Sequence, residues 1–151
     1  MEEYILGNAV ESIKASAFQN CTGMVSVSIP ASVTSIGGSA FQNCRSLSSI
    51  IIPEGVTQIN NSTFSGCEAL TAITIPESIT TIGENAFADC RSLTSISIPE
   101  AVTIIGKAAF SGCDGLTAVH ITDLSAWCKI SFTNSDSQPL CYAHRLYLNN
   151  Q

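Results

Sequence analysis

The residues in this sequence that are best suited to catalysis or metal binding are its cysteines and histidines, because thiols and imidazoles can act as nucleophiles or bind zinc. Five of the seven cysteines recur every 23 residues: Cys21, Cys44, Cys67, Cys90 and Cys113. If equivalent residues stack in successive layers, neighbouring thiols lie roughly 4.8 Å apart. A disulfide needs converging Cβ atoms about 3.8 Å apart. The spacing therefore predicts buried, reduced cysteines that pack as small apolar side chains.

A zinc site near the C-terminus is the second possibility, with the candidate ligands Cys128, Cys141, His144 and His120. Structural zinc sites usually contain a close C-x-x-C pair, and Cys128 and Cys141 are too far apart to form one. Strand alternation also places His120 on the opposite face from its neighbours. We therefore expect surface or capping residues here, with no metal.

Catalytic and cofactor-binding motifs are absent from the sequence. It contains no G-x-S-x-G, no H-E-x-x-H and no glycine-rich phosphate loop. Two histidines leave few options for acid-base catalysis, and the abundant serines follow the 23-residue period. The sequence thus predicts a protein that is not an enzyme and has no cofactor.

Charge and hydropathy exclude further classes. The formal net charge is -6 with only six Lys and Arg residues, whereas nucleic-acid binding requires a basic surface. The longest apolar run, at residues 50–52, is far shorter than the roughly 20 residues of a membrane-spanning helix. Residues 1–4 have neither a basic start nor an apolar segment, so we expect no secretion signal within this chain.

The cysteines belong to a longer repeat that must position every candidate residue. The repeat reads L-x-x-I-x-I-P, followed by a second aliphatic pair such as Val56 and Ile59, and then A-F-x-x-C, with departures at Met24 and Thr63. The alternating aliphatics before the proline predict a strand with one buried face. One such coil cannot bury its apolar face alone, so stacked copies must share a core. We expect about five repeats over residues 1–121 and a non-repeat capping segment over residues 122–151.

Turn residues recur with the same period. The residue before each repeated cysteine tolerates positive φ and predicts a left-handed position: Asn20, Asn43, Gly66, Asp89 and Gly112. Residues entering A-F-x-x-C are predicted to cap a single helical turn: Ser16, Ser39, Ser62 and Asn85. A second set of positive-φ residues is expected after the return aliphatic: Gly37, Asn60, Gly83 and Gly106.

The repeat, for example residues 70–76 followed by residues 82–90, resembles the BspA-type leucine-rich repeats, and the resemblance covers about residues 4–121. It implies a β-rich, right-handed solenoid with a parallel sheet on one face and short second strands and single helical turns on the other. Residues 127–132 and 139–149 look like the non-repeat segment of that family. The resemblance further implies extracellular or cell-surface recognition, as in adhesins, and does not identify the ligand.

Outward-facing positions of the predicted sheet are the candidate partner-binding residues. They form two columns, bordered by an acidic column that attracts a basic partner: Ser28, Ile51, Thr74, Ser97 and His120; Ser26, Ser49, Ala72 and Ser95; Glu54, Glu77 and Glu100. Small side chains leave a smooth face open to a protein, but they also suit a surface that binds nothing.

Two functions follow from these columns. The first is a protein-binding or adhesion module whose partner is a protein or another cell-surface macromolecule. The alternative is a structural spacer with no ligand of its own. Coil ends expose strand edges, so we expect a monomer or a weak end-to-end dimer.

Overall fold

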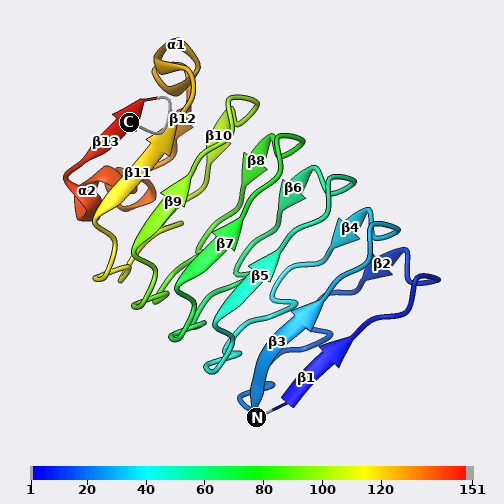
Figure 1. The fold of residues 1–151 in the computed structure, drawn as a ribbon. Helices are drawn as coiled ribbons and strands as arrows, with labels where there is room; N and C mark the ends of the chain where they lie inside the picture. The colour runs from blue at the N-terminus through cyan, green and yellow to red at the C-terminus, as the bar shows by residue number, and fades with distance from the viewer. Residues whose placement is uncertain (1, 149–151) are drawn as a thin grey trace.

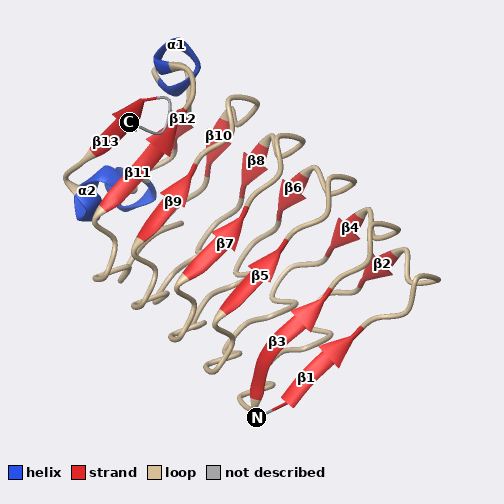
Figure 2. Ribbon diagram, viewed as in Figure 1, coloured by secondary structure: helices blue, strands red, loops and turns tan. Residues whose placement is uncertain are grey.

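The computed structural model describes residues 2–148, which wind into a parallel β-solenoid (Figure 1). Each coil contributes one strand to a broad wall and one two-residue strand to the opposite wall, here called the return wall (Figure 2). The broad wall contains β1 (Glu2–Ile5), β3 (Met24–Ser28), β5 (Ser49–Ile51), β7 (Ala72–Thr74), β9 (Ser95–Ser97), β11 (Ala118–Ile121) and β13 (Leu146–Leu148). The return wall contains β2 (Ser12–Ile13), β4 (Ser35–Ile36), β6 (Gln58–Ile59), β8 (Thr81–Ile82), β10 (Ile104–Ile105) and β12 (Ser131–Phe132).

The broad wall is parallel, as predicted, but its backbone ladder is not continuous. Strands pair as β1 with β3, β5 with β7, and β11 with both β9 and β13. Between β3 and β5, and between β7 and β9, the strands stay adjacent without forming a ladder. Within each paired group equivalent residues of successive repeats lie opposite one another, for example Ile50 and Ile73. The broad wall is therefore a single surface crossed by two seams.

The return wall also has a seam, between β4 and β6, and Asn60 explains it. Gly83 and Gly106, the equivalent residues of the next two coils, donate backbone N–H bonds to Ile59 and Ile82. A Cβ on Gly106 would lie 2.6 Å from the Glu84 nitrogen, so this column needs glycine. Asn60 has a side chain, and its amide donates to the Ile36 carbonyl instead, at 2.7 Å. One side-chain bond replaces the ladder and holds the two coils apart.

The core lies between the two walls and consists of columns of like residues. The repeated Leu, Ile and Val side chains are buried, except for partly buried ones such as Ile29 and Ile73. Phe41, Phe64, Phe87 and Phe110 are also buried. Successive phenylalanine rings stack with centroids 5.3 to 5.6 Å apart, within the range of favourable aromatic pairs. Phe18 and Cys21, in the first of these coils, are only partly buried. The predicted core is therefore confirmed, with weaker burial at this end.

The turns between the return wall and the cysteines differ from the expected capped helical turns. The residues predicted as caps have left-handed backbones, with φ of 59° at Ser16 and 53° at Asn85. Isolated i to i+3 bonds, such as Cys67 N–H to Phe64, alternate with bonds to the next coil, such as Phe64 N–H to Ala86. The left-handed residue turns its own N–H toward the next coil, as in Ser62 to Glu84 at 2.8 Å. Bonding between coils therefore takes precedence over helix formation.

The second set of predicted left-handed positions is also wrong. Among the described glycines only Gly66 and Gly112 have positive φ, at 73° and 72°. Gly37 is needed because the backbone of the preceding coil, at Ala15, would collide with a Cβ. The left-handed positions before the cysteines are confirmed, including Asn43 and Asp89.

The C-terminal segment contains α1 (Leu124–Trp127), the 3₁₀ helix η1 (Ser135–Ser137) and α2 (Leu140–Ala143). Its strands β12 and β13 pair with β10 and β11, so both walls continue into it. Trp127 is buried and packs edge-on against Phe132, at a centroid distance of 5.5 Å. The division into repeats over residues 1–121 and a capping segment over residues 122–151 stays a prediction, and residues 149–151 lie outside the described residues.

Candidate functional site

The strand register brings the predicted outward residues onto one face of the broad wall. The pairs Ser49 with Ala72 and Ile51 with Thr74 lie in two adjacent columns. The same columns continue through Ser95 and Ser97 of β9. In β3 they contain Ser26 and Ser28. We call this surface the sheet face; all of its predicted members are exposed except Ser26 and His120, which are half-buried.

Sequence reasoning missed residues at both ends of the sheet face, Glu3 and Ile5 of β1 and Tyr147 of β13. Glu3 is exposed and pairs with Ser26, and Tyr147 pairs with His120. Ile5 pairs with Ser28 and therefore stands in the same column as Ile51. Its side chain is 82% exposed, and that of Ile51 is 69% exposed. The strand motif L-x-x-I-x-I-P is not present around β1, so only the strand pairing places Ile5 there. The sheet face thus begins with two aliphatic side chains that are open to solvent.

His120 is a less accessible member of the surface than predicted. Its ring stacks on Tyr147 of β13 at 5.0 Å with an interplanar angle of 16°. Its Nδ1 atom is buried and has no hydrogen-bond partner in the described residues. The sequence did not predict this contact, because Tyr147 lies outside the repeat. Stacking leaves His120 at the border of the sheet face.

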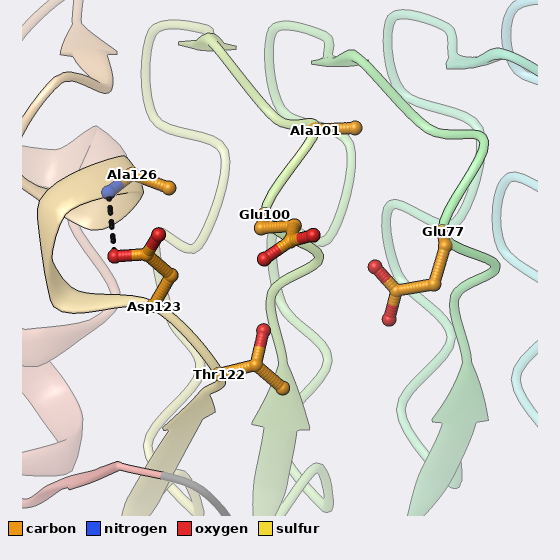
Figure 3. Close-up of a pocket in the computed structure, with 6 residues that line it drawn as sticks. All are labelled: Glu77, Glu100, Ala101, Thr122, Asp123 and Ala126. Carbon is orange, nitrogen blue, oxygen red and sulfur yellow. Dashed lines mark hydrogen bonds between the residues drawn. The ribbon is translucent and has the colours of Figure 1, made fainter.

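The acidic column lies beside the ends of the broad-wall strands (Figure 3). Glu77, Glu100 and Asp123 come from three successive coils and line a groove of about 720 Å³ together with Ala101, Thr122 and Ala126. Asp123 is already engaged, because its carboxylate accepts the backbone N–H groups of Ser125 and Ala126 and caps α1. The remaining members, Glu54, Glu77 and Glu100, form what we call the glutamate row.

The glutamate row carries free negative charge along one border of the sheet face. All three side chains are exposed. None is in an ion pair with any residue in the described range 2–148. Like charges on neighbouring strands repel one another weakly in solvent. The row therefore attracts cationic groups without being neutralised by the protein itself.

The repeated cysteines are placed where their thiols react poorly. Cys44, Cys67, Cys90 and Cys113 are buried, and each Sγ donates to a phenylalanine carbonyl of the preceding coil at 3.1 to 3.2 Å. Burial raises the pKa of the Cys44 thiol to about 11 and that of Cys113 to about 12. Burial also raises the pKa values of Cys67 and Cys90. Because the thiolate is the reactive form, these side chains are poor nucleophiles and metal ligands at neutral pH.

The four candidate zinc ligands are not gathered into a site. Within residues 2–148, no group of three or more His, Cys, Asp or Glu side chains is placed to hold a metal ion. Cys128 and Cys141 are exposed and free. The Cys141 thiol donates to the Ser135 carbonyl at 3.3 Å. Over the same range, no helix has the length and apolar character needed to span a membrane.

Solved structures with similar folds are bacterial leucine-rich repeat proteins. A leucine-rich cell-surface protein of Faecalibacterium prausnitzii matches with 41% identity, a TM-score of 0.83 and coverage of 88% of this chain and 35% of that protein. The leucine-rich repeat protein of T. pallidum matches with 33% identity, a TM-score of 0.75 and coverage of 78% and 57%. One from Bacteroides ovatus matches with 30% identity, a TM-score of 0.70 and coverage of 86% and 44%. The chain thus spans 35% to 57% of the length of these structures.

The repeat itself also has a family match. No curated protein sequence matches the chain. Residues 1–138 match the BspA type leucine rich repeat region in six copies. The fold typical of this family is a solenoid, usually without enzymatic activity, and the stacked coils described above have that fold. The chain therefore belongs to the family of BspA-type leucine-rich repeat proteins.

Proposed function

We propose that this chain is a non-enzymatic protein-binding module whose partner docks on the sheet face. The observation that carries the proposal is the exposed face of small side chains bordered by the glutamate row. Small residues such as Ser49 and Ala72 allow a partner's backbone to approach closely over a broad area. Unpaired carboxylates speed association with a basic partner. The contact surface consists of the glutamate row and the predicted outward-facing residues of four strands, with His120 at its border: Ser26, Ser28, Ser49, Ile51, Ala72, Thr74, Ser95 and Ser97.

We further propose that the module acts outside the cell, in adhesion or recognition. Support comes from the Faecalibacterium prausnitzii structure, which is that of a cell-surface protein. The net charge of -6 agrees with a partner that is a protein and not a nucleic acid.

A spacer function is the alternative, and the same small side chains support it, since hydroxyl groups on a sheet face also suit contact with water alone. The two functions differ in what a change to the face does. A spacer tolerates bulky charged substitutions on every exposed surface, whereas a docking face does not.

The experiment compares wild type with Thr74→Arg/Ser97→Arg. Both side chains are exposed and lie on adjacent strands of the sheet face. The matched control is Gln58→Arg/Ile104→Arg, which adds the same charge at exposed positions of the return wall. Binding of labelled protein to purified matrix proteins and to epithelial cells is measured. Loss of binding in the first variant alone supports the docking face, while equal binding of all three proteins contradicts it.

A further inference from the structure

The seam between β3 and β5 opens a hollow in the sheet face. Its volume is about 300 Å³, and its lining includes Ser26 and Ser28 of β3 and Ser49 and Ile51 of β5. This volume is at the lower end of the range for ligand pockets in proteins. It is large enough for one large apolar side chain and too small for a folded element.

One exposed isoleucine, Ile51, lines this hollow, and a second, Ile5, stands one strand beyond it, on the far side of β3. Ile5 pairs with Ser28 in the β1–β3 ladder, and Ile51 occupies the same column one repeat later. Ile5 and Ile51 are therefore two strands apart, roughly 10 Å, with the small Ser28 side chain between them. Single exposed aliphatic residues are ordinary. Here Ile51 lines a hollow whose wall also contains Ile29 and Ile50, and Ile5 adds a second exposed aliphatic side chain beyond Ser28. We call this region the isoleucine recess: Ile5, Ser28 and Ile51.

The glutamate row begins where the isoleucine recess ends. Glu54 follows Ile51 by three residues, after the strand-ending Pro53. The equivalent residue of the preceding repeat, beside Ser28, is the uncharged Ala31. From Glu54 the row continues away from the recess through Glu77 to Glu100, toward α1. The column of Ile5, Ser28 and Ile51 is thus apolar, with one carboxylate beside it at Glu3, which pairs with Ser26 in the adjacent column. The glutamate row borders the following three coils.

We propose that the isoleucine recess anchors one large apolar side chain of a protein partner, and that basic residues adjacent to this anchor bind the glutamate row. This inference rests on the proposed docking function and specifies the chemistry of the partner. Charge complementarity carries the second half of it, because the three carboxylates are exposed and form no ion pair within the described residues. Protein interfaces commonly concentrate their binding energy in a few large side chains that are seated in pockets.

The probes are short acetylated and amidated peptides, titrated into isotope-labelled protein and followed by NMR. One peptide carries a tryptophan followed by three lysines separated by glycines, and a second has the reverse order. Two controls replace the tryptophan with serine or the lysines with glutamates. We expect saturable shifts at Ser28, Ile51 and Glu77 with a tryptophan-lysine peptide, weaker binding of the serine control, and none of the glutamate control. The affinity should fall with added salt because the carboxylates are exposed.

The decisive variant is Ile51→Thr, which gives this position the residue type of Thr74 in the next repeat. Its matched control is Ile104→Thr, which changes an exposed isoleucine of the return wall. We expect Ile51→Thr to weaken the tryptophan-lysine peptide about tenfold, because an apolar contact surface is lost, and Ile104→Thr to leave it unchanged. Equal effects of the two variants, shifts that map away from the recess, or no saturable binding of any peptide would overturn the inference.

Failure of the inference is distinguishable from failure of the proposed function. If Thr74→Arg/Ser97→Arg abolishes binding to cells or matrix proteins while Ile51→Thr does not, the sheet face docks a partner without the apolar anchor. That result overturns the inference alone. If neither variant changes that binding, both the inference and the docking function are wrong.

Discussion

The Sγ atom of Cys67 donates a hydrogen bond to the carbonyl oxygen of Phe41, one coil earlier, at 3.2 Å. The same carbonyl also accepts the backbone N–H of Cys44, within its own coil. One oxygen thus closes a turn and joins two coils. This arrangement explains why a weakly polar thiol suits a fully buried position.

The buried thiols should make stability fall at alkaline pH. Burial raises the pKa of Cys44 from 9.0 to about 11, so the unfolded state loses this proton at a lower pH than the folded state. The contribution of the thiol is complete below about pH 9 and is lost as the pH rises toward 11. Urea unfolding at pH 8 and pH 10.5 measures it, and Cys44→Ala should show a smaller decrease than wild type. An identical decrease in both proteins would exclude the thiol as the cause.

Thiol reactivity provides a second test of whether the repeated cysteines are buried. In folded protein the buried cysteines, such as Cys90, should react slowly with a thiol reagent, and the exposed Cys128 and Cys141 should react quickly. Denaturant should make all seven reactive. Rapid modification of Cys90 without denaturant would show that the coils open readily.

The phenylalanine stack predicts a graded loss of stability. Phe64 is fully buried between Phe41 and Phe87, so Phe64→Ala should cost about 3 to 5 kcal/mol. Phe18 is only partly buried, and Phe18→Ala should cost clearly less. Urea unfolding of the two variants tests this order, and a loss below about 1 kcal/mol for Phe64→Ala would mean that the stack is not core.

The close approach of neighbouring coils at the return wall predicts opposite effects for two substitutions in the glycine column. Gly106→Ala should destabilise strongly, because the added Cβ would lie 2.6 Å from the Glu84 nitrogen. Asn60→Gly should instead allow the backbone N–H at this position to bond Ile36, as Gly83 bonds Ile59. Slower hydrogen exchange of that amide is the expected result. Unchanged exchange would show that the Asn60 side chain does not cause the seam.

Columns of like residues made most of the fold predictable from the sequence. Phe64 and Cys67 recur with one period, so their burial and stacking follow from the repeat alone. The seams were harder to predict because they depend on single departures, such as Asn60 in a column of glycines. That substitution was visible in the sequence, but its consequence depends on the close approach of the neighbouring coil, which only the three-dimensional packing shows.

The turn residues show where local propensity misleads. Serine and asparagine at positions such as Ser62 and Asn85 suit a helix cap, but here their N–H groups bond the next coil from a left-handed backbone. The signal in the sequence was Ala108, which occupies the equivalent position of the last repeat and is a poor cap. Ile5 and Tyr147 were missed because neither stands in an L-x-x-I-x-I-P motif, and strand pairing alone adds them to the face.

Removing charge from the glutamate row should alter association and not folding. Glu77→Gln/Glu100→Gln changes exposed side chains without ion pairs in the described residues, so the unfolding midpoint should stay nearly constant. Association with a basic partner should slow, most of all at low ionic strength. The control is Glu84→Gln, an exposed glutamate near the return wall. Equal association rates for both variants across a salt series would remove the row from the docking surface.

The central claim is that the sheet face is where a partner docks, and the Thr74→Arg/Ser97→Arg variant tests it most directly. Its binding to epithelial cells and matrix proteins is compared with that of wild type and of Gln58→Arg/Ile104→Arg, after circular dichroism has shown equal folding of all three. The docking function predicts that binding is lost in the sheet-face variant and retained in the return-wall variant. Retention of full binding by Thr74→Arg/Ser97→Arg would contradict it.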